Sequence, residues 1–288
     1  MPIKRDADIA SRVLSGSGDH MRILFLGDMV GKPARKVVAK FVAQRKEALD
    51  IDVVIANSDN LAHGRSVTRK TVEEMLTAGG VDILTCGDHA WDNTQALDIV
   101  KAGDLNFVCP CNLAGVDPVL SGRTFSIKDE KILAINLMGK VFIDKAIVSP
   151  FEVVDKILEA NEKGEQARII VLDFHAETTS EKKAMARYLD GRVTAVLGTH
   201  THVQTADEEV MRAGTAYITD AGMVGIKDSI LGCEESAVLE QYTAGSAFKY
   251  KLAEEGEVEV SGVIFDADEK TGLARSIERV QERILYEA

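Results

Sequence analysis

The sequence predicts an α/β fold in which a two-layer core of β-sheets is covered by outer helices. Short runs of β-branched and aliphatic residues recur along the 288-residue chain, and several precede a segment with helical periodicity. These runs are apolar throughout rather than alternating, which is typical of strands buried on both faces. No internal repeat, low-complexity tract or linker interrupts the chain after residue 21, so we expect a single domain over residues 21–288.

The first half of the chain contains three of these strand–helix units. Arg22–Asp28 precedes a helical segment in which Pro33 suits the first turn. The apolar stripe of that helix comprises Val37, Val38, Phe41 and Val42. The second and third units pair strand 52–60 with helix 68–78 and strand 82–89 with helix 94–101.

The second half is predicted to continue the pattern. A hairpin is expected over 123–137, with its turn at 128–131. Strand 168–175 precedes helix 180–189, which should open with a capping box of Thr178 and Glu181. The remaining strand-like runs are residues 194–200, 215–220, 248–253 and 257–265.

Composition limits the classes of partner. The formal net charge of -12 argues against a broad basic surface for duplex nucleic acid. An anionic substrate is compatible with this negative net charge, because bound metal ions can reverse the sign of the local electrostatic field. No apolar run approaches the ~18 residues of a membrane helix, so no membrane partner is expected. The sequence is compatible with a homo-oligomer.

Two features concern location and the N-terminus. The four cysteines form no CxxC pair and no zinc-type spacing, which favours a reduced cytoplasm. Residues 1–20 contain early acidic residues, no apolar core and a Ser/Gly-rich end, so they do not resemble a secretory signal. We expect this segment to be a disordered extension.

Polar side chains of metal-binding type follow the predicted strands. Because sites in open α/β sheets form at the carboxyl ends of strands, five segments should deliver these groups to one edge. Their carboxylate, carboxamide and imidazole groups, without a thiolate, suit Mn, Fe or Zn in a reactive site. The residues are Asp28, Asp59, Asn60, Asp88, His89, His175, His200 and His202.

Each of these residues alone has an ordinary structural explanation. A single aspartate after a strand is commonly a turn or cap residue, and a single histidine is commonly a hydrogen-bonded core residue. The His200 and His202 pair is a stronger signal, because alternate residues of an extended segment share a face. The coincidence of all five clusters at strand ends favours a metal centre over these separate explanations.

The number of donors indicates two metal ions rather than one. Two ions about 3.5–4 Å apart can clamp the attacking and leaving oxygens of a displacement at phosphorus, and each lowers the pKa of bound water. His89 adjoins Asp88 and is therefore the candidate general acid that protonates the leaving alkoxide. Asp92 is predicted to be a helix N-cap beside a buried Trp91, with a wall of the site as the alternative.

Seven motifs together resemble the calcineurin-like metallophosphoesterases, and more closely their bacterial YmdB-type branch. The resemblance runs from Met21 to about Gly262. In order, the motifs are GDMVG, NSDNLAHG, CGDHAWD, DFHAETTSEK, GTHTHVQTAD, GTAYITDAGMVG and DSILG. This resemblance implies a four-layer αββα sandwich that holds two metal ions and hydrolyses 2',3'-cyclic nucleotides or related phosphodiesters.

The resemblance also implies a role for each residue. Asp28, Asp59, Asn60 and His202 would surround one metal ion. Asp59, Asp88, His175 and His200 would surround the other, with Asp59 as the bridge. His89 would be the general acid, and His63 would lie at the rim and contact the substrate phosphate.

The sequence departs from the branch at two ligand positions. NSDN replaces the usual NGEN, so the bridge is Asp59 and is one methylene shorter than glutamate. GDH replaces GNH, so Asp88 contributes a carboxylate where an amide is usual. The added negative charge should damp the Lewis acidity of the adjacent metal.

These features leave three candidate functions for the protein. The first is a dinuclear phosphodiesterase that acts on small nucleotides through metal-bound hydroxide. The second is a phosphomonoesterase or protein phosphatase at the same site. The third is a metal-bound regulatory protein that binds nucleotide or RNA with little turnover, which the two carboxylate departures keep open.

Overall fold

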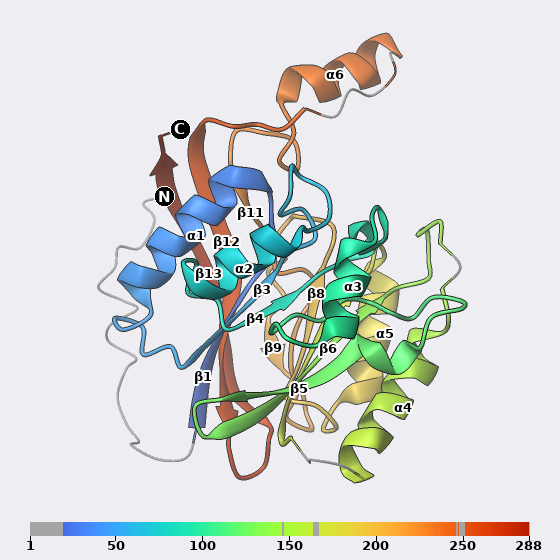
Figure 1. The fold of residues 1–288 in the computed structure, drawn as a ribbon. Coiled ribbons are helices and arrows are strands. Elements are labelled where there is room, and N and C mark those ends of the chain that lie inside the picture. The colour runs from blue at the N-terminus through green and yellow to red at the C-terminus, as the bar shows by residue number, and fades with distance from the viewer. Residues whose placement is uncertain (1–19, 146, 164–166, 246, 248–250, 288) are drawn as a thin grey trace.

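The protein contains two β-sheets with helices packed against them (Figure 1). A computed structural model describes residues 20–145, 147–163, 167–245, 247 and 251–287. The predicted N-terminal extension, residues 1–20, lies outside these ranges except for His20, which begins the first strand. Within the described ranges no helix combines the length and apolarity needed to cross a bilayer.

The first sheet contains seven strands. Its order is β2-β11-β12-β1-β3-β4, and β13 pairs with β12. β1, β3 and β4 are parallel, so their carboxyl ends lie at one edge, whereas β12 runs antiparallel to β1. The strands are β1 (His20–Leu26), β2 (Asp28–Met29), β3 (Val53–Asn57), β4 (Ile83–Thr85), β11 (Met223–Ile226), β12 (Gly256–Asp268) and β13 (Ala274–Tyr286).

The second sheet contains six strands in the order β5-β6-β7-β8-β10-β9. β5 and β6 form the predicted hairpin, and β6, β7, β8 and β10 are parallel. The strands are β5 (Gly122–Ile127), β6 (Glu130–Met138), β7 (Ile169–His175), β8 (Ala195–Thr199), β9 (Glu209–Val210) and β10 (Ala216–Ile218).

Most of the α-helices pack on the two sheets and follow strands of the parallel sets. The four helices predicted from periodicity are present within a few residues of the expected bounds. The α-helices are α1 (Gly31–Arg45), α2 (Arg69–Thr77), α3 (Gln95–Ala102), α4 (Pro150–Lys163), α5 (Thr179–Leu189) and α6 (Glu235–Ala244). Two short 3-10 helices, η2 (Asp88–Trp91) and η3 (Pro118–Ser121), lie in loops.

Three apolar clusters form the core. One contains side chains of both sheets, including Ile55 of β3 and Val171 of β7. A second joins Val54 of β3 to Phe41 of α1, and a third joins Leu172 of β7 to Met185 of α5. Successive residues of β3 and β7 therefore enter different clusters, which explains the uninterrupted apolar runs. The predicted mixed α/β fold with two sheets is confirmed.

Some local predictions were incomplete or wrong. The elements α4, α6 and β13 were not predicted from the sequence. Residues 251–253, the described part of the run 248–253, contribute an isolated bridge at Leu252 rather than a strand. Thr178 caps α5 as expected, but Glu181 does not complete the capping box. Its carboxylate instead accepts hydrogen bonds from the backbone N–H groups of Lys140 and Val141.

Candidate active site

The predicted site residues lie at or just beyond the carboxyl ends of strands from both sheets. His175 is the last residue of β7, and His200 immediately follows β8. In the first sheet, Asp28 lies in β2 just after β1, while Asp59 and Asp88 lie in the segments after β3 and β4. Parallel strand direction in each sheet thus brings side chains that are distant in sequence to one region.

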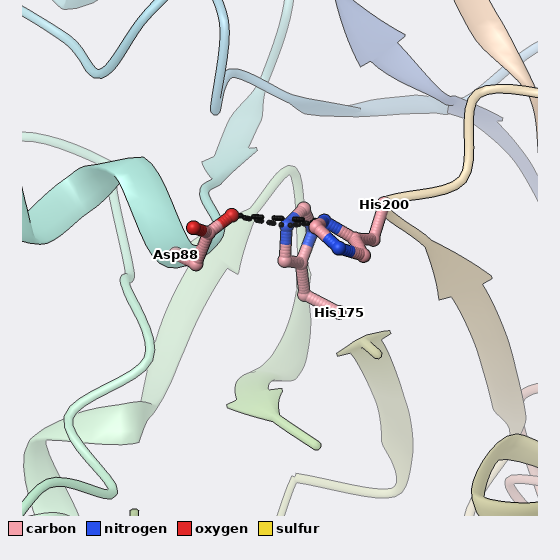
Figure 2. Close-up of side chains that lie close together, drawn as sticks. All are labelled: Asp88, His175 and His200. Atoms are coloured by element: carbon pink, nitrogen blue, oxygen red, sulfur yellow. Dashed lines mark hydrogen bonds and ion pairs between the residues drawn. The ribbon is translucent and has the colours of Figure 1, made fainter. Parts of the chain in front are cut away.

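Asp88, His175 and His200 form a close group of potential ligands (Figure 2). His175 Nε2 lies 3.3 Å from Asp88 Oδ1 and 3.0 Å from His200 Nδ1. His200 Nδ1 lies 3.6 Å from the same Asp88 oxygen. Figure 2 shows the Asp88 carboxylate pointing at both rings, so three donor atoms from three segments converge.

Asp59 extends this group toward the first sheet. Its Oδ2 lies 3.7 Å from His175 Nε2, and its Oδ1 accepts a hydrogen bond of 3.0 Å from the backbone N–H of His89. One ring nitrogen of His89 and one carboxylate oxygen from each of Asp59 and Asp88 also lie within 4.8 Å of one another.

A second group contains Asp28, Asn60 and His202. His202 Nε2 lies 3.1 Å from Asn60 Oδ1 and 3.9 Å from Asp28 Oδ1. Asp28 Oδ2 accepts a hydrogen bond from the backbone N–H of His200, but Asp28 Oδ1 is buried without a hydrogen-bond partner. A buried carboxylate oxygen is costly to leave unpaired, and a bound cation would satisfy it.

Backbone geometry around these ligands is unusual. His200 and His202 have φ values of 96° and 62°, in the left-handed region that non-glycine residues rarely adopt. At Gly87, a Cβ atom would lie 2.3 Å from His175 Nε2, so only glycine lets β4 end this close to the ring.

A buried ion pair stabilises the histidine segment, residues 200–202, on its interior side. Lys182 Nζ donates a 2.8 Å hydrogen bond to Asp220 Oδ2, and both side chains are almost fully buried. The same oxygen accepts from the backbone N–H and hydroxyl of Thr201, which lies between the two histidines. These contacts position the segment that carries His200 and His202.

The electrostatics of the site show an excess of buried acid. Burial, reinforced by Asp220, raises the pKa of Asp28 to about 8. Burial, with Asp88 and Asp28 nearby, raises the pKa of Asp59 well above its ordinary value. Burial also opposes ionisation of Asp88, but the neighbouring rings of His175, His89 and His200 lower its pKa overall.

Burial has the opposite effect on the imidazoles, because it disfavours their charged form. It lowers the pKa of His175 to about 3 and lowers the pKa values of His200 and His202. The histidines are therefore neutral near pH 7, which is the form that binds a metal. Neutral imidazoles, buried carboxylates and the unpaired Asp28 oxygen together fit metal binding.

His89 contacts Asp92, which the sequence pattern predicted to be a helix N-cap. Its Nδ1 lies 2.7 Å from Asp92 Oδ2. Asp92 does not cap the following helix: the N-cap of α3 is Thr94. The N-cap prediction for Asp92 was therefore wrong, whereas Trp91 is anchored by its Nε1–H, which donates to the Pro110 carbonyl.

His63 lies in the segment that follows Asn60. Its side chain is exposed and its φ is 55°. Asn60 Nδ2 donates to the carbonyl of the adjacent Gly64, which ties this segment to a predicted ligand. Contact between His63 and a substrate phosphate stays a prediction.

Several polar residues around the ligands were not singled out from the sequence. Glu177 Oε2 lies 3.0 Å from His200 Nε2. Thr199 and Asp173 form a hydrogen-bonded chain behind His175. The alternation of β7 offered a signal for Asp173, because residues two apart on a strand share a face. Glu177 had no comparable signal.

The fold and site define a mixed α/β protein with a carboxylate–imidazole site at the carboxyl ends of its strands. Residues 24–280 match the profile of the family described as YmdB-like protein. The chain belongs to this family, as its motifs predicted.

Curated and solved relatives match this chain over most of their length. The 2',3'-cyclic-nucleotide 2'-phosphodiesterase of Bacillus subtilis (strain 168) is 38% identical over 260 residues, covering 90% of this chain and 96% of that protein. A hypothetical protein from Thermus thermophilus has a TM-score of 0.81 at 33% identity, covering 91% of this chain and 99% of the other. A structure described as a novel phosphatase from Mycoplasma pneumoniae also has a TM-score of 0.81 at 33% identity, covering 93% and 94% of the two chains.

Proposed function

We propose that this protein is a metal-dependent phosphodiesterase that hydrolyses small phosphodiesters, with 2',3'-cyclic nucleotides as the substrate class. The observation that carries the proposal is the convergence of Asp28, Asp59 and Asp88 with three neutral imidazoles at the strand ends. The substrate class is supported by the name of the Bacillus subtilis relative.

Two metal ions fit this donor set better than one. Asp28, Asn60 and His202 would hold one ion, and Asp88, His175 and His200 would hold the other, with Asp59 bridging them. Oxygen and imidazole donors suit Mn, Fe or Zn. When bound, the ions would supply a nucleophile at neutral pH and offset charge at the phosphate.

Side chains of the protein would protonate the leaving group and contact the substrate phosphate. We assign His89 as the general acid for the leaving alkoxide. Asp92 contacts Nδ1 of its ring, which leaves Nε2 to deliver the proton. The side chain of His89 is 25% exposed, so a substrate can reach it. His63 is proposed to contact the substrate phosphate from the rim.

The layered architecture and the domain bounds belong to the same proposal. The three apolar clusters support a four-layer αββα sandwich, in which helices cover the outer face of each sheet. They also support one domain from residue 21 onward, because both sheets share the middle cluster. In that arrangement the metal centre lies where the two sheets present their carboxyl ends.

The direct test is hydrolysis of 2',3'-cyclic AMP by the purified protein. Parallel reactions would contain added Mn²⁺ or EDTA, and a simple phosphomonoester would serve as the comparison substrate. We expect Mn²⁺-dependent ring opening with little monoester cleavage. Faster monoester cleavage would replace the proposal with a phosphomonoesterase, and ligand binding without turnover would support a regulatory protein.

A further inference from the structure

We propose that Asp173 and Thr199 are positioning residues that select which ring nitrogen of His175 faces the metal site. The inference deepens the proposed function and rests on metal binding at that site. It concerns residues behind His175 that are not themselves among the proposed ligands.

The hydrogen-bond chain has a defined direction. Thr199 Oγ1 lies 2.6 Å from Asp173 Oδ1 and 3.0 Å from His175 Nδ1. A hydroxyl has one hydrogen, and the Asp173 carboxylate accepts it. Thr199 must then accept from His175, so His175 carries its proton on Nδ1. The unprotonated Nε2 is left facing Asp88 and His200, as a metal ligand requires.

The remaining contacts of Asp173 support its role as an acceptor. Its Oδ2 accepts from Asn57 Nδ2 at 2.8 Å and from Thr85 Oγ1 at 2.5 Å. Each oxygen of the Asp173 carboxylate therefore faces a donor, with Thr199 at Oδ1 and with Asn57 and Thr85 at Oδ2.

Strand register explains why these three residues meet. Asp173 and His175 lie two residues apart on β7 and therefore share a face. Thr199 of β8 is the register partner of His175. All three residues are fully buried. A buried carboxylate costs stability unless it is hydrogen-bonded, and here its bonds lead to a predicted ligand.

The other two histidines follow the same rule with different acceptors. Glu177 contacts His200 at Nε2, so Nδ1 turns inward. The Leu231 carbonyl contacts His202 at Nδ1, so Nε2 turns inward beside Asn60. Each inward nitrogen is thus the one that its outer acceptor leaves unprotonated, an arrangement that orients ligands and raises their basicity.

Thr199→Val and Thr199→Ser provide a matched test. Valine keeps the shape of threonine without the hydroxyl, whereas serine keeps the hydroxyl. Co²⁺ would be titrated into the metal-free proteins at pH 8, with affinity and the visible Co²⁺ spectrum as readouts. We expect Thr199→Val to bind Co²⁺ about 10–100-fold more weakly with an altered spectrum. Thr199→Ser should resemble the wild type.

The inference would be overturned if Thr199→Val bound Co²⁺ like the wild type, or if serine lost as much affinity as valine. If Thr199→Val fails to fold, Glu177→Leu removes the acceptor beside His200 at a half-exposed position and tests the same rule, and wild-type binding there would overturn it. A wild-type protein that binds Co²⁺ but leaves cyclic nucleotides intact would contradict the proposed function and not this inference.

Discussion

The aspartates of the site differ more from one another than their shared residue type suggests. Asp28 and Asp59 are buried, and their pKa values are raised, whereas the pKa of Asp88 is lowered beside His175. Burial and neighbouring carboxylates account for the raised values, and the surrounding imidazoles account for the lowered one. Sequence could identify these residues as potential ligands, but it could not assign their protonation, because that depends on neighbours from other strands.

His89→Ala tests the proposed general acid. The variant should retain its metal ions, because the seven proposed ligands remain. Its activity on an ester with a poor alkoxide leaving group should fall about 10²–10⁴-fold, with a smaller loss on a nitrophenyl ester that needs no protonation. Asp92→Asn should show the same pattern more weakly, because only the orientation of the ring changes. Equal losses on both esters would contradict the role of His89.

Asp88→Asn tests the carboxylate that replaces the usual amide of the branch. The amide oxygen can still bind a metal, but one negative charge is removed. We expect the acidic limb of the pH–activity profile to move to lower pH, because a less negative site favours ionisation of bound water. Steady-state rates between pH 5 and 9 would measure this shift. An unchanged profile with unchanged metal content would show that the added charge does not tune the site.

At the scale of secondary-structure elements, the strand–helix units were predicted correctly where a polar strand end preceded an amphipathic helix. α1, α2, α3 and α5 followed this pattern. α6 did not, because it projects from the body of the molecule and Val238 is its one buried residue among those described (Figure 1). α4 carries a readable stripe of Val153, Val154 and Ile157, so this helix was predictable from its sequence although it was not predicted.

The candidate site was likewise predictable from the sequence only in part. Strand ends placed the seven proposed ligands and His89 in one region, as their sequence positions predicted. Their outer partners could not be predicted in the same way. Asp92, Glu177 and Asp220 act through contacts that depend on loop geometry, including the left-handed backbone at His200 and His202.

Lys182→Met tests the ion pair beneath the histidine segment. The substitution leaves Asp220 buried without its cation, which costs about 3–5 kcal/mol of unfolding free energy. The neighbouring Lys183 is 63% exposed and faces Asp207 at 4.0 Å, so Lys183→Met should stay within about 0.5 kcal/mol of the wild type. Denaturant unfolding of both variants measures the difference. Equal effects would refute a special role for Lys182.

At the scale of the whole molecule, the two sheets bring together acids that neither sheet could neutralise alone. The first sheet supplies Asp28, Asp59 and Asp88, and the second supplies His175 and His200. Because the imidazoles are neutral near pH 7, the site lacks enough positive charge for its carboxylates. Metal binding should therefore be coupled to global stability and to pH.

Stability of the metal-free protein should fall between pH 6.5 and 8. The folded-state pKa of Asp28 is raised from 3.8 to about 8, so the folded protein holds a proton that the unfolded chain has released, and stability is lost as the pH rises through this window. His175, with its pKa lowered from 6.5 to about 3, contributes in the opposite direction only below about pH 6.5.

Thermal unfolding at pH 6.5 and 8, with and without Mn²⁺, measures this coupling. A metal ion at 100 times its Kd should add about 2.7 kcal/mol of unfolding free energy, and the ion should remove most of the loss at pH 8. A metal-free protein that is more stable at pH 8 than at pH 6.5 would contradict the assignment of buried, proton-binding carboxylates.

The most direct test of the central claim is a crystal structure of the Mn²⁺-loaded protein with anomalous scattering recorded for manganese. Two anomalous peaks about 3.5–4 Å apart are expected, with Asp59 contacting both. Asp28, Asn60 and His202 should surround one peak, and Asp88, His175 and His200 the other. A single peak, or two peaks without Asp59 between them, would contradict the proposed dinuclear centre.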